Sequence, residues 1–582
     1  MKSFQSRANL IAFFFVLGAL AIVIQVVRIQ NSKEADSFRT WGKEIMWQYE
    51  TLPSERGKIF DQHMHMLAGN KVVYEVGITL KDVKNANTVA MTLNTVLGKD
   101  YKEILDLLTN PPAGAVYRVI DQYVDADKTK QLKDLQSLMK DKYRNDGDPS
   151  LAGLGFYAHQ IRSYPDKSLA SNVIGFVNLN NQGNYGIEQK YDSLLAGVPK
   201  QVLVPKDPNL ITEMPKNPSG ADLILTIDRD IQSMVETELK KGVQDTGATA
   251  GTIVVMDPRT GAILAMASTP QMDLNDYTKF GEIYKTAGEF NRAVSVQFEP
   301  GSIFKILTMS AAIDSGRVVP SSTYLDTGFY PIGGVNIVNW DHNAWGVQDM
   351  VGCLQHSLNV CMARLADLMG QNTFYTYMRR FGIGYATNID LSNEAIGHLK
   401  DPADTDWSKV DLGTNSFGQG VSVSPIQMMT AATALANDGK MVYPHVVYAM
   451  VSNGSEHITP TQILGTPISP QSARTVSNML ADALQAGQSL ANVKGYRIAG
   501  KTGTASIPGP DGVYDPNLTN QSFMGWGPVD DPKFMVFVWM ERPLKSDWAS
   551  YVASPIFHDV VQKLVVLMDI PPDDIRKQLL GQ

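Results

Sequence analysis

The chain has 582 residues, which is too many for one hydrophobic core, so we expect two or more domains. Hydrophobic residues make up 44% and charged residues 19%, a composition typical of folded proteins rather than disordered chains. The formal net charge of −8 gives no sign of a basic surface, which argues against nucleic acid as a partner.

An apolar segment lies close to the N-terminus. Residues 10–27 are interrupted only by Gln25 and are long enough to cross a bilayer as one helix. Basic residues precede the segment, whereas those after it are accompanied by acidic residues, so the positive-inside rule favours a cytoplasmic N-terminus. Residues 19–21 (ALA) resemble a signal-peptide cleavage site, but the apolar stretch continues to Val27, which favours an uncleaved membrane anchor.

The next segment mixes short strands and helices. Helices are predicted at residues 86–97 and 101–108 within residues 39–201, and we expect this segment to be a non-catalytic pedestal. Residues 204–218 are rich in proline and indicate a connecting loop or an extended ribbon.

A new set of elements begins after residue 221. A strand is predicted at residues 223–227 and a helix at residues 230–242. Residues 252–256 and 262–267 form a predicted hairpin around a loop with proline and glycine.

The hairpin is expected to open the sheet of a second domain. Further strands are predicted at residues 496–506, 522–527 and 534–541, a covering helix at residues 554–568, and a mostly helical region at residues 315–494. We therefore expect an antiparallel sheet with helices on its faces beside a helical subdomain, with a cleft between them.

A serine and a lysine are placed for nucleophilic chemistry. Pro300 and Gly301 predict a turn and residues 303–313 an apolar helix, so Ser302 falls at a helix N-terminus. Lys305 lies one helical turn further on, and an amine with a lowered pKa can take the proton of a serine hydroxyl. An ordinary helix cap is the competing interpretation of Ser302.

The same spacing occurs a second time, so this motif alone is weak. Ser137 and Lys140 lie within residues 134–146, a charged amphipathic stretch with no turn before it. We interpret this second pair as part of a solvated helix face.

Two further motifs follow the serine in the chain. They are Ser357-Leu358-Asn359 and Lys501-Thr502-Gly503-Thr504. Taken alone, the first is typical of a turn and the second of a surface strand. In this order, however, the three motifs resemble the signature set of penicillin-binding proteins and β-lactamases.

Cys353 and Cys361 are the only cysteines in the chain, and they flank the Ser-x-Asn motif symmetrically. On two flanking helices they would lie too far apart to bridge without a chain reversal, and two cysteines alone cannot make a zinc site. We therefore expect buried free thiols, no metal and no cofactor.

Other blocks extend the resemblance to the class B penicillin-binding proteins, which are monofunctional peptidoglycan transpeptidases. The blocks that resemble that family's N-terminal module are residues 56–61 (RGKIFD), 67–68 (LA), 162–165 (RSYP), 175–177 (GFV), 186–188 (GIE) and 194–197 (LLAG). Residues 417–420 (FGQG) resemble a segment beside the family's active site. Residues 62–65 (QHMH) and the aromatic residues 339–345 (NWDHNAW) depart from its pattern, and we expect them to affect local structure rather than chemistry.

The resemblance implies an α+β fold with one transmembrane helix, a mixed pedestal domain and a serine β-lactamase-like transpeptidase domain. The predicted domains are a cytoplasmic tail at residues 1–9, an anchor at 10–28, a pedestal at 29–220, a transpeptidase domain at 221–570 and a tail at 571–582. The transpeptidase domain would then lie outside the cytoplasmic membrane of a bacterium.

The motifs suggest specific roles. Ser302 attacks a carbonyl, and Lys305, held neutral by burial or by repulsion from Lys501, accepts its proton. Ser357 relays the proton to the leaving amine, and Asn359 binds the substrate's peptide or Lys305.

The Lys-Thr-Gly strand is expected to bind substrate. Gly503 has no Cβ, so a donor peptide can lie against the strand edge, with Thr502 and Thr504 beside its carboxylate. The resemblance implies that the backbone N–H groups of Ser302 and Thr504 stabilise the oxyanion.

The resemblance also implies substrates and partners. The donor is a peptidoglycan stem peptide that ends in D-alanyl-D-alanine, the acceptor is an amine of a neighbouring stem, and β-lactams acylate Ser302. A membrane glycosyltransferase of the SEDS type is the implied partner, because no glycosyltransferase motif precedes Ser302.

Two other functions compete with this interpretation. A β-lactamase or carboxypeptidase shares the scaffold, but no glutamate that would activate water is identifiable by motif. A β-lactam sensor or scaffold would need an output module, and only residues 1–9 precede the apolar segment. Roles in cell division and in elongation both remain open.

Overall fold

The structure is a computed structural model that describes residues 2–33, 35–52, 54–143, 145, 147–205, 217–508 and 514–579. It contains two compact units, one made of Met1–Glu55 and Ala196–Gly220 and the other of Arg56–Leu195 and Ala221–Gln582. Most of the predicted proline-rich connection, residues 206–216, lies outside the described residues, as do residues 580–582 of the predicted tail.

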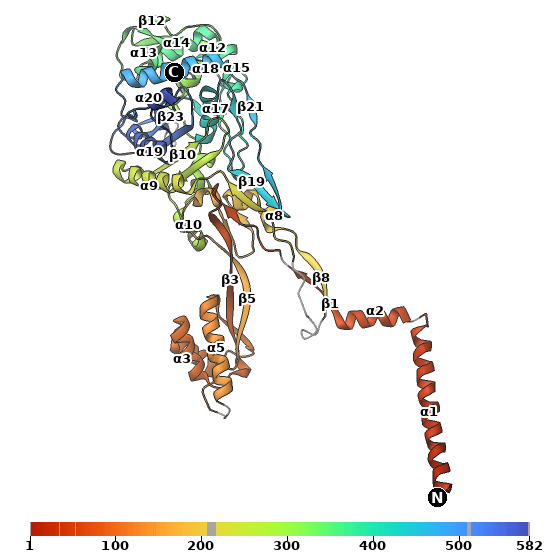
Figure 1. The fold of residues 1–582 in the computed structure, drawn as a ribbon. Coiled ribbons are helices and arrows are strands. Elements are labelled where there is room, and N and C mark those ends of the chain that lie inside the picture. The colour runs from red at the N-terminus through yellow and green to blue at the C-terminus, as the bar shows by residue number, and fades with distance from the viewer. Residues whose placement is uncertain are drawn as a thin grey trace. The chain divides into compact units, whose positions relative to one another are not determined.

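The first unit contains the apolar segment. Helix α1 (Lys2–Gln30) includes the whole predicted span, and its apolar part has a mean hydropathy of 2.9. It is the one helix in the described part of the chain that is long and apolar enough to cross a membrane. Helix α2 (Ala35–Met46) follows, and strand β1 (Trp47–Leu52) pairs antiparallel with β8 (Lys200–Pro205) (Figure 1).

The second unit includes a lobe built on one long strand. Strand β3 (Met66–Thr79) pairs antiparallel with β4 (Tyr117–Asp125) and with β5 (Leu154–Ser163). The helices of this lobe are α3 (Ala86–Leu97), α4 (Tyr101–Thr109) and α5 (Ala126–Lys142) (Figure 1). Both predicted helices are confirmed.

Capping explains why α3 begins and ends where the sequence predicts. The side chain of Asn85 accepts a hydrogen bond from the N–H of Thr88, and Gly98 ends the helix in the left-handed conformation. The second Ser-x-x-Lys pair, Ser137 and Lys140, lies exposed on α5, so it is a solvated helix face as predicted.

A buried ionic network joins three of the sequence blocks of the pedestal. The two carboxylate oxygens of Glu188 accept hydrogen bonds from Nε of Arg56 at 2.7 Å and Nε of Arg162 at 2.6 Å. The hydroxyl of Tyr164, on the same block as Arg162, donates to the same carboxylate at 3.4 Å. Since all three charged side chains are at most 2% exposed, these separate blocks are parts of one structural core.

Residues 62–65, which depart from the family's sequence pattern, form a local turn. The buried carboxylate of Asp61 accepts hydrogen bonds from the N–H groups of His63 and His65. Met64 has a φ of 67°, so a non-glycine residue here adopts the left-handed conformation that favours glycine.

The main sheet of the second unit has five antiparallel strands in the order β11-β10-β24-β23-β22. The strands are β10 (Ala250–Met256), β11 (Ile263–Ser268), β22 (Ala499–Pro508), β23 (Tyr514–Gly527) and β24 (Phe534–Glu541). The predicted hairpin and later strands are confirmed, although β23 begins well before residue 522.

Helices cover both faces of this sheet. Alternate residues of β10 point to two different cores: Ile253 packs with helices α9 (Arg229–Thr246) and α19 (Ala553–Leu567), and Val254 with the core on the other side. Because both faces are covered, strand β24 is apolar along almost its whole length rather than alternating. The predicted covering helix is α19.

The region from residue 315 to 494 is helical, but it also contains hairpins that the sequence did not predict. Its helices are α13 (Met350–Gln355), α14 (Asn359–Met369), α15 (Gln371–Arg380), α16 (Lys409–Asn415), α17 (Pro425–Ala436) and α18 (Pro470–Ala486). Its strands are β12 (Thr323–Asp326), β13 (Phe329–Ile332), β14 (Val335–Val338), β15 (Gly346–Asp349), β16 (His398–Leu399), β17 (Val421–Ser422), β18 (Met441–Val442), β19 (Val447–Ser452), β20 (Ser455–Ile458) and β21 (Ile463–Gly465).

A second sheet crosses the predicted boundary between pedestal and transpeptidase domain. Strand β9 (Asp222–Leu225) pairs in parallel with β2 (Ile59–Phe60) and antiparallel with β19. The predicted domain bounds therefore stay predictions. The α+β architecture itself, an antiparallel sheet with helices on both faces, is confirmed.

Candidate active site

Ser302 lies in a tight turn that is packed against strand β22. It belongs to the 3₁₀ helix η5 (Gly301–Phe304). The α-helix α12 (Lys305–Asp314) begins at Lys305, later than predicted, because the turn before it has the tighter hydrogen bonding of a 3₁₀ helix. Gly301 has a φ of 54°, and its N–H donates to the carbonyl of Gly418 at 3.1 Å. A Cβ at Gly301 would lie 2.7 Å from the carbonyl oxygen of Thr504, so only glycine fits there.

The ammonium group of Lys305 is fully buried and points at the Ser-x-Asn turn. Its Nζ donates to the backbone carbonyl of Ser357 at 2.5 Å, to Oγ of Ser357 at 3.2 Å and to Oδ1 of Asn359 at 2.7 Å. Among the described residues, none of its hydrogen bonds reaches Oγ of Ser302. Burial lowers the pKa of Lys305 well below its usual value, and the charge of Lys501 lowers it further.

Lys501 is a second buried lysine, on strand β22. Burial lowers its pKa to about 7, and its Nζ donates to the hydroxyl of Thr502 at 3.1 Å and to that residue's carbonyl at 3.2 Å. The two buried amines with lowered pKa values are therefore close enough for the charge of Lys501 to act on Lys305.

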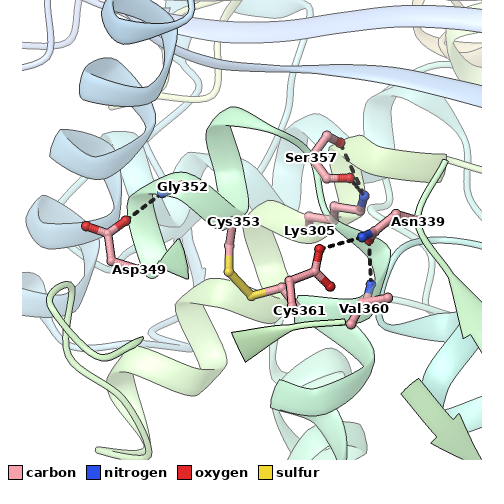
Figure 2. Close-up of a disulfide and its surroundings, with 9 residues drawn as sticks. Lys305, Asn339, Asp349, Gly352, Cys353, Ser357, Val360 and Cys361 are labelled. Atoms are coloured by element: carbon pink, nitrogen blue, oxygen red, sulfur yellow. Dashed lines mark hydrogen bonds between the residues drawn. A yellow bond between two sulfur atoms is a disulfide. The ribbon is translucent and has the colours of Figure 1, made fainter. Parts of the chain in front are cut away.

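Ser357 occupies a chain reversal between helices α13 and α14, with a φ of 54°. The reversal brings Cys353 and Cys361 to a Cα–Cα distance of 6.0 Å, and they form a disulfide (Figure 2). The prediction of two free thiols is therefore wrong. It assumed that no such reversal occurred between the two helices.

The aromatic residues 339–345 support the Ser-x-Asn turn directly. Nε1 of Trp340 donates to the carbonyl of His356 at 2.9 Å, and the ring of Trp345 stacks on the His356 ring with centroids 4.0 Å apart. The N–H of Val360 donates to Oδ1 of Asn339 at 3.2 Å (Figure 2). These residues therefore contact the Ser-x-Asn turn itself, a contact that the sequence did not predict.

Gly503 packs closely against neighbouring segments on the side to which a side chain would point. A Cβ at this position would lie 2.4 Å from Oγ of Ser522, 2.9 Å from Cγ2 of Ile303 and 3.0 Å from the carbonyl of Pro300. The space is therefore filled by Ser522 of strand β23 and by the turn that carries Ser302. The contact of Gly503 with a substrate backbone stays a prediction. Among the described residues, strand β22 is nevertheless the last strand of its sheet, and one of its edges pairs with no other described strand.

One cavity of about 1050 Å³ brings the three motifs together. The predicted site residues that line it are Ser302, Ser357, Asn359, Thr502 and Thr504. Lys305 and Lys501 lie buried beside it. Phe417 and Gln419, from the segment predicted to flank the active site, line it as well. Among the described residues, no three His, Cys, Asp or Glu side chains are grouped to hold a metal ion.

Comparison with known proteins identifies two domains. The family described as penicillin binding protein transpeptidase domain matches residues 251–562, and the penicillin-binding protein dimerisation domain matches residues 51–218. The chain is 29% identical to stage V sporulation protein D of Bacillus subtilis, over 89% of this chain and 79% of that protein. It is also 29% identical to peptidoglycan D,D-transpeptidase FtsI of Escherichia coli, over 98% of this chain and 95% of that protein.

Solved structures agree with the sequence matches. The crystal structure of penicillin binding protein 3 from Mycobacterium tuberculosis with aztreonam superposes with a TM-score of 0.69 and 26% identity, covering 90% of this chain and 98% of that chain. The antiparallel sheet and the cavity, together with the family match over residues 251–562, define a penicillin binding protein transpeptidase domain. The chain belongs to the class B penicillin-binding proteins, which confirms the resemblance found in its sequence.

Proposed function

We propose that the chain is a membrane-anchored peptidoglycan D,D-transpeptidase that acts through an acyl-enzyme on Ser302. The observation that carries this proposal is the place of Lys305. A buried amine with a lowered pKa lies one residue beyond the turn of Ser302 and is held by Ser357 and Asn359 in the wall of the cavity. Such an amine can act as the general base that a serine nucleophile needs.

In the acylation step, neutral Lys305 takes the hydroxyl proton of Ser302, and Oγ forms a bond with the carbonyl carbon of the penultimate D-alanine. The carbon–nitrogen bond to the terminal D-alanine breaks. Ser357, 3.2 Å from Nζ of Lys305, relays the proton to the leaving nitrogen, so Lys305 is neutral again.

In the transfer step, the nitrogen of an acceptor amine forms a bond with the acyl carbon and the carbon–Oγ bond breaks. The proton lost by the amine passes through Lys305 to Oγ of Ser302. The products are a new amide cross-link and the free enzyme, with no change of oxidation state.

Charge and hydrogen bonding stabilise these steps. The backbone N–H groups of Ser302 and Thr504 are the proposed oxyanion donors. The edge strand β22 offers backbone groups to the donor peptide, and Lys501 with Thr502 binds its terminal carboxylate. A protonated Lys501 serves this binding, whereas a neutral Lys305 serves the chemistry.

The cavity favours transfer over hydrolysis. Asp547 is the one carboxylate among the described residues that line it, and that side chain is exposed. Glu299 is the nearest glutamate in sequence, but its carboxylate accepts hydrogen bonds from the hydroxyl of Tyr514 and the N–H of Gly420. A glutamate that activates water, as in class A β-lactamases, is therefore not found along the cavity.

Helix α1 is the proposed membrane anchor, with the catalytic unit outside the cytoplasm. The proposed partner is a membrane glycosyltransferase of the SEDS type that polymerises the glycan, and β-lactams are proposed to acylate the same serine.

The test is to label the purified full-length chain with a fluorescent penicillin and to map the adduct by mass spectrometry. We expect one adduct, on Ser302, that persists when excess unlabelled penicillin is added. Ser302→Ala should abolish labelling, whereas Ser137→Ala, in the second Ser-x-x-Lys pair, should label normally. Rapid loss of the adduct would indicate a hydrolase, and wall growth supported by Ser302→Ala would indicate a scaffold.

A further inference from the structure

The loop after strand β24 brings an exposed carboxylate and an indole ring to the mouth of the cavity. Asp547 and Trp548 lie between two fixed points on the active-site strands. Before them, the carbonyl of Ser546 accepts from Nε2 of the buried Gln521 at 2.5 Å; after them, the N–H of Ala549 donates to Oγ1 of Thr504 at 3.3 Å. Asp547 is thus held within two residues of a contact to the Lys-Thr-Gly strand.

The indole ring of Trp548 reaches across to the other side of the cavity. It packs edge to face on Trp340, with ring centroids 4.8 Å apart. Trp340 in turn donates its indole N–H to the carbonyl of His356, the residue before Ser357. The aromatic pair therefore spans from the loop held by Thr504 to the turn that holds Ser357.

The negative charge of Asp547 has no positive partner among the described residues that line the cavity. Asp547 makes no ion pair or hydrogen bond with another described residue, and the described residues that line the cavity include no lysine or arginine. Trp340 is 44% exposed and Trp548 42%, so ring faces remain available to a ligand. Burial lowers the pKa of His356, so its ring is uncharged at neutral pH and does not repel a cation.

We propose that Asp547, Trp340 and Trp548 form the subsite that receives the acceptor amine as an ammonium ion. This inference rests on the proposed transpeptidase function. A primary alkyl amine such as that of lysine is protonated at neutral pH. A carboxylate attracts it by charge, and indole faces attract cations. The ammonium gives one proton to the solvent before its nitrogen attacks the acyl carbon.

This subsite is made of other residues than those assigned to the donor carboxylate. The donor carboxylate is assigned to Lys501 and Thr502 on strand β22, whereas the aromatic pair lies between Thr504 and the Ser357 turn. Donor and acceptor would therefore contact different residues, and changes at Asp547 should affect transfer more than acylation.

The test uses the full-length chain in detergent, and the donor is the N-benzoyl-D-alanyl thioester of thioglycolate, whose carboxylate takes the place of that of the terminal D-alanine. The acceptors are Nα-acetyl-lysine methylamide, which is cationic, and hydroxylamine, which is neutral at the assay pH. The products are separated by chromatography, and the half-saturating concentration of each acceptor is measured. Penicillin labelling counts the active sites in every preparation.

We expect Asp547→Asn to raise the half-saturating concentration of the lysine derivative about threefold, as for an exposed ion pair. Asp547→Lys should raise it about tenfold, because the added charge repels the ammonium. Trp340→Leu with Trp548→Leu should raise it about threefold through loss of the cation–π contact. The effect on hydroxylamine should be smaller in each case. Glu456→Gln, an exposed carboxylate on β20, is the matched control and should change neither acceptor.

Two results would overturn the inference alone: an unchanged lysine dependence in both Asp547 variants, or an equal loss for hydroxylamine, which would indicate a structural role. If the wild-type chain is labelled by penicillin but transfers the donor to neither amine, the proposed function fails and this inference fails with it.

Discussion

Nζ of Lys305 and Oδ1 of Asn359 lie 2.7 Å apart, and this contact fixes which way the buried amine points. Ammonium has three donor hydrogens and no acceptor. In the structure, Lys305 directs its hydrogen bonds at Ser357 and Asn359, both in the cavity wall. The direction of the amine is thus fixed before substrate arrives, toward Ser357 and Asn359. To act as the proposed base, it must be neutral and must reach Oγ of Ser302.

Lys305→Arg should abolish this function while keeping the positive charge. A guanidinium group cannot be deprotonated in a protein, so it cannot accept the proton of Ser302. Loss of a general base typically costs 10²- to 10⁴-fold in rate, and we expect the acylation rate constant for fluorescent penicillin to fall by about 10³. Circular dichroism would verify the fold. A variant that acylates within tenfold of wild type would contradict the assignment of Lys305 as the base.

The two lysines predict opposite dependences on pH. Acylation needs neutral Lys305, so its rate should rise as the pH rises through the lowered pKa of that amine. Binding of the donor carboxylate needs charged Lys501, so it should weaken as the pH rises above about 7. Profiles of kcat/KM for the thioester should therefore fall on both sides of a maximum.

Lys501→Gln separates these two effects. It removes the nearby positive charge, so the pKa of Lys305 should rise and the rising limb of the acylation profile should move to higher pH. The decrease of kcat/KM at high pH should disappear. An unshifted rising limb in Lys501→Gln would show that burial alone sets the pKa of Lys305.

Local sequence signals predicted the regular elements well. Helix α3 begins and ends as predicted because Asn85 and Gly98 are strong capping residues. Strand β24 was predicted correctly because a sheet covered on both faces gives one continuous apolar run. The three motifs were also predicted to meet, and one cavity brings them together.

The errors concern contacts that depend on the path of the chain. The disulfide was missed because the turn between the two cysteines places Ser357 at a φ of 54°, a conformation that a serine does not signal in a sequence. The contact of Trp340 with His356 joins two segments through a tertiary hydrogen bond. The cluster of aromatic residues just before the Ser-x-Asn motif was the available signal.

The disulfide predicts redox-dependent stability of the Ser-x-Asn turn. It links the end of α13 to the first turn of α14 around Ser357. Breaking it increases the conformational entropy of the unfolded chain and so lowers the free energy of unfolding. For a loop of this length, Cys353→Ser with Cys361→Ser should lower the free energy of unfolding by about 2–3 kcal/mol. Thermal unfolding with and without dithiothreitol measures this.

The reducing agent supplies the control for that experiment. Dithiothreitol should lower Tm of the wild-type chain and leave the double serine variant unchanged. If dithiothreitol has no effect on the wild type under conditions that expose its thiols to alkylation, the link does not stabilise the native fold.

Glu188→Gln tests the ionic core of the pedestal. The substitution removes the negative charge between Arg56 and Arg162, both 2% exposed. Arg56 keeps its ion pair with Asp192 at 2.8 Å, whereas the buried guanidinium group of Arg162 is left without a carboxylate partner among the described residues. Breaking a buried ion pair in this way typically costs about 3–5 kcal/mol of folding free energy. Chemical denaturation should show this loss, whereas Glu456→Gln should lie within about 0.5 kcal/mol of wild type.

Because Glu188 is not among the residues that line the cavity, folded protein at low temperature should still be labelled by penicillin at Ser302. Equal stability of the two variants would show that the arginines of the pedestal do not depend on Glu188.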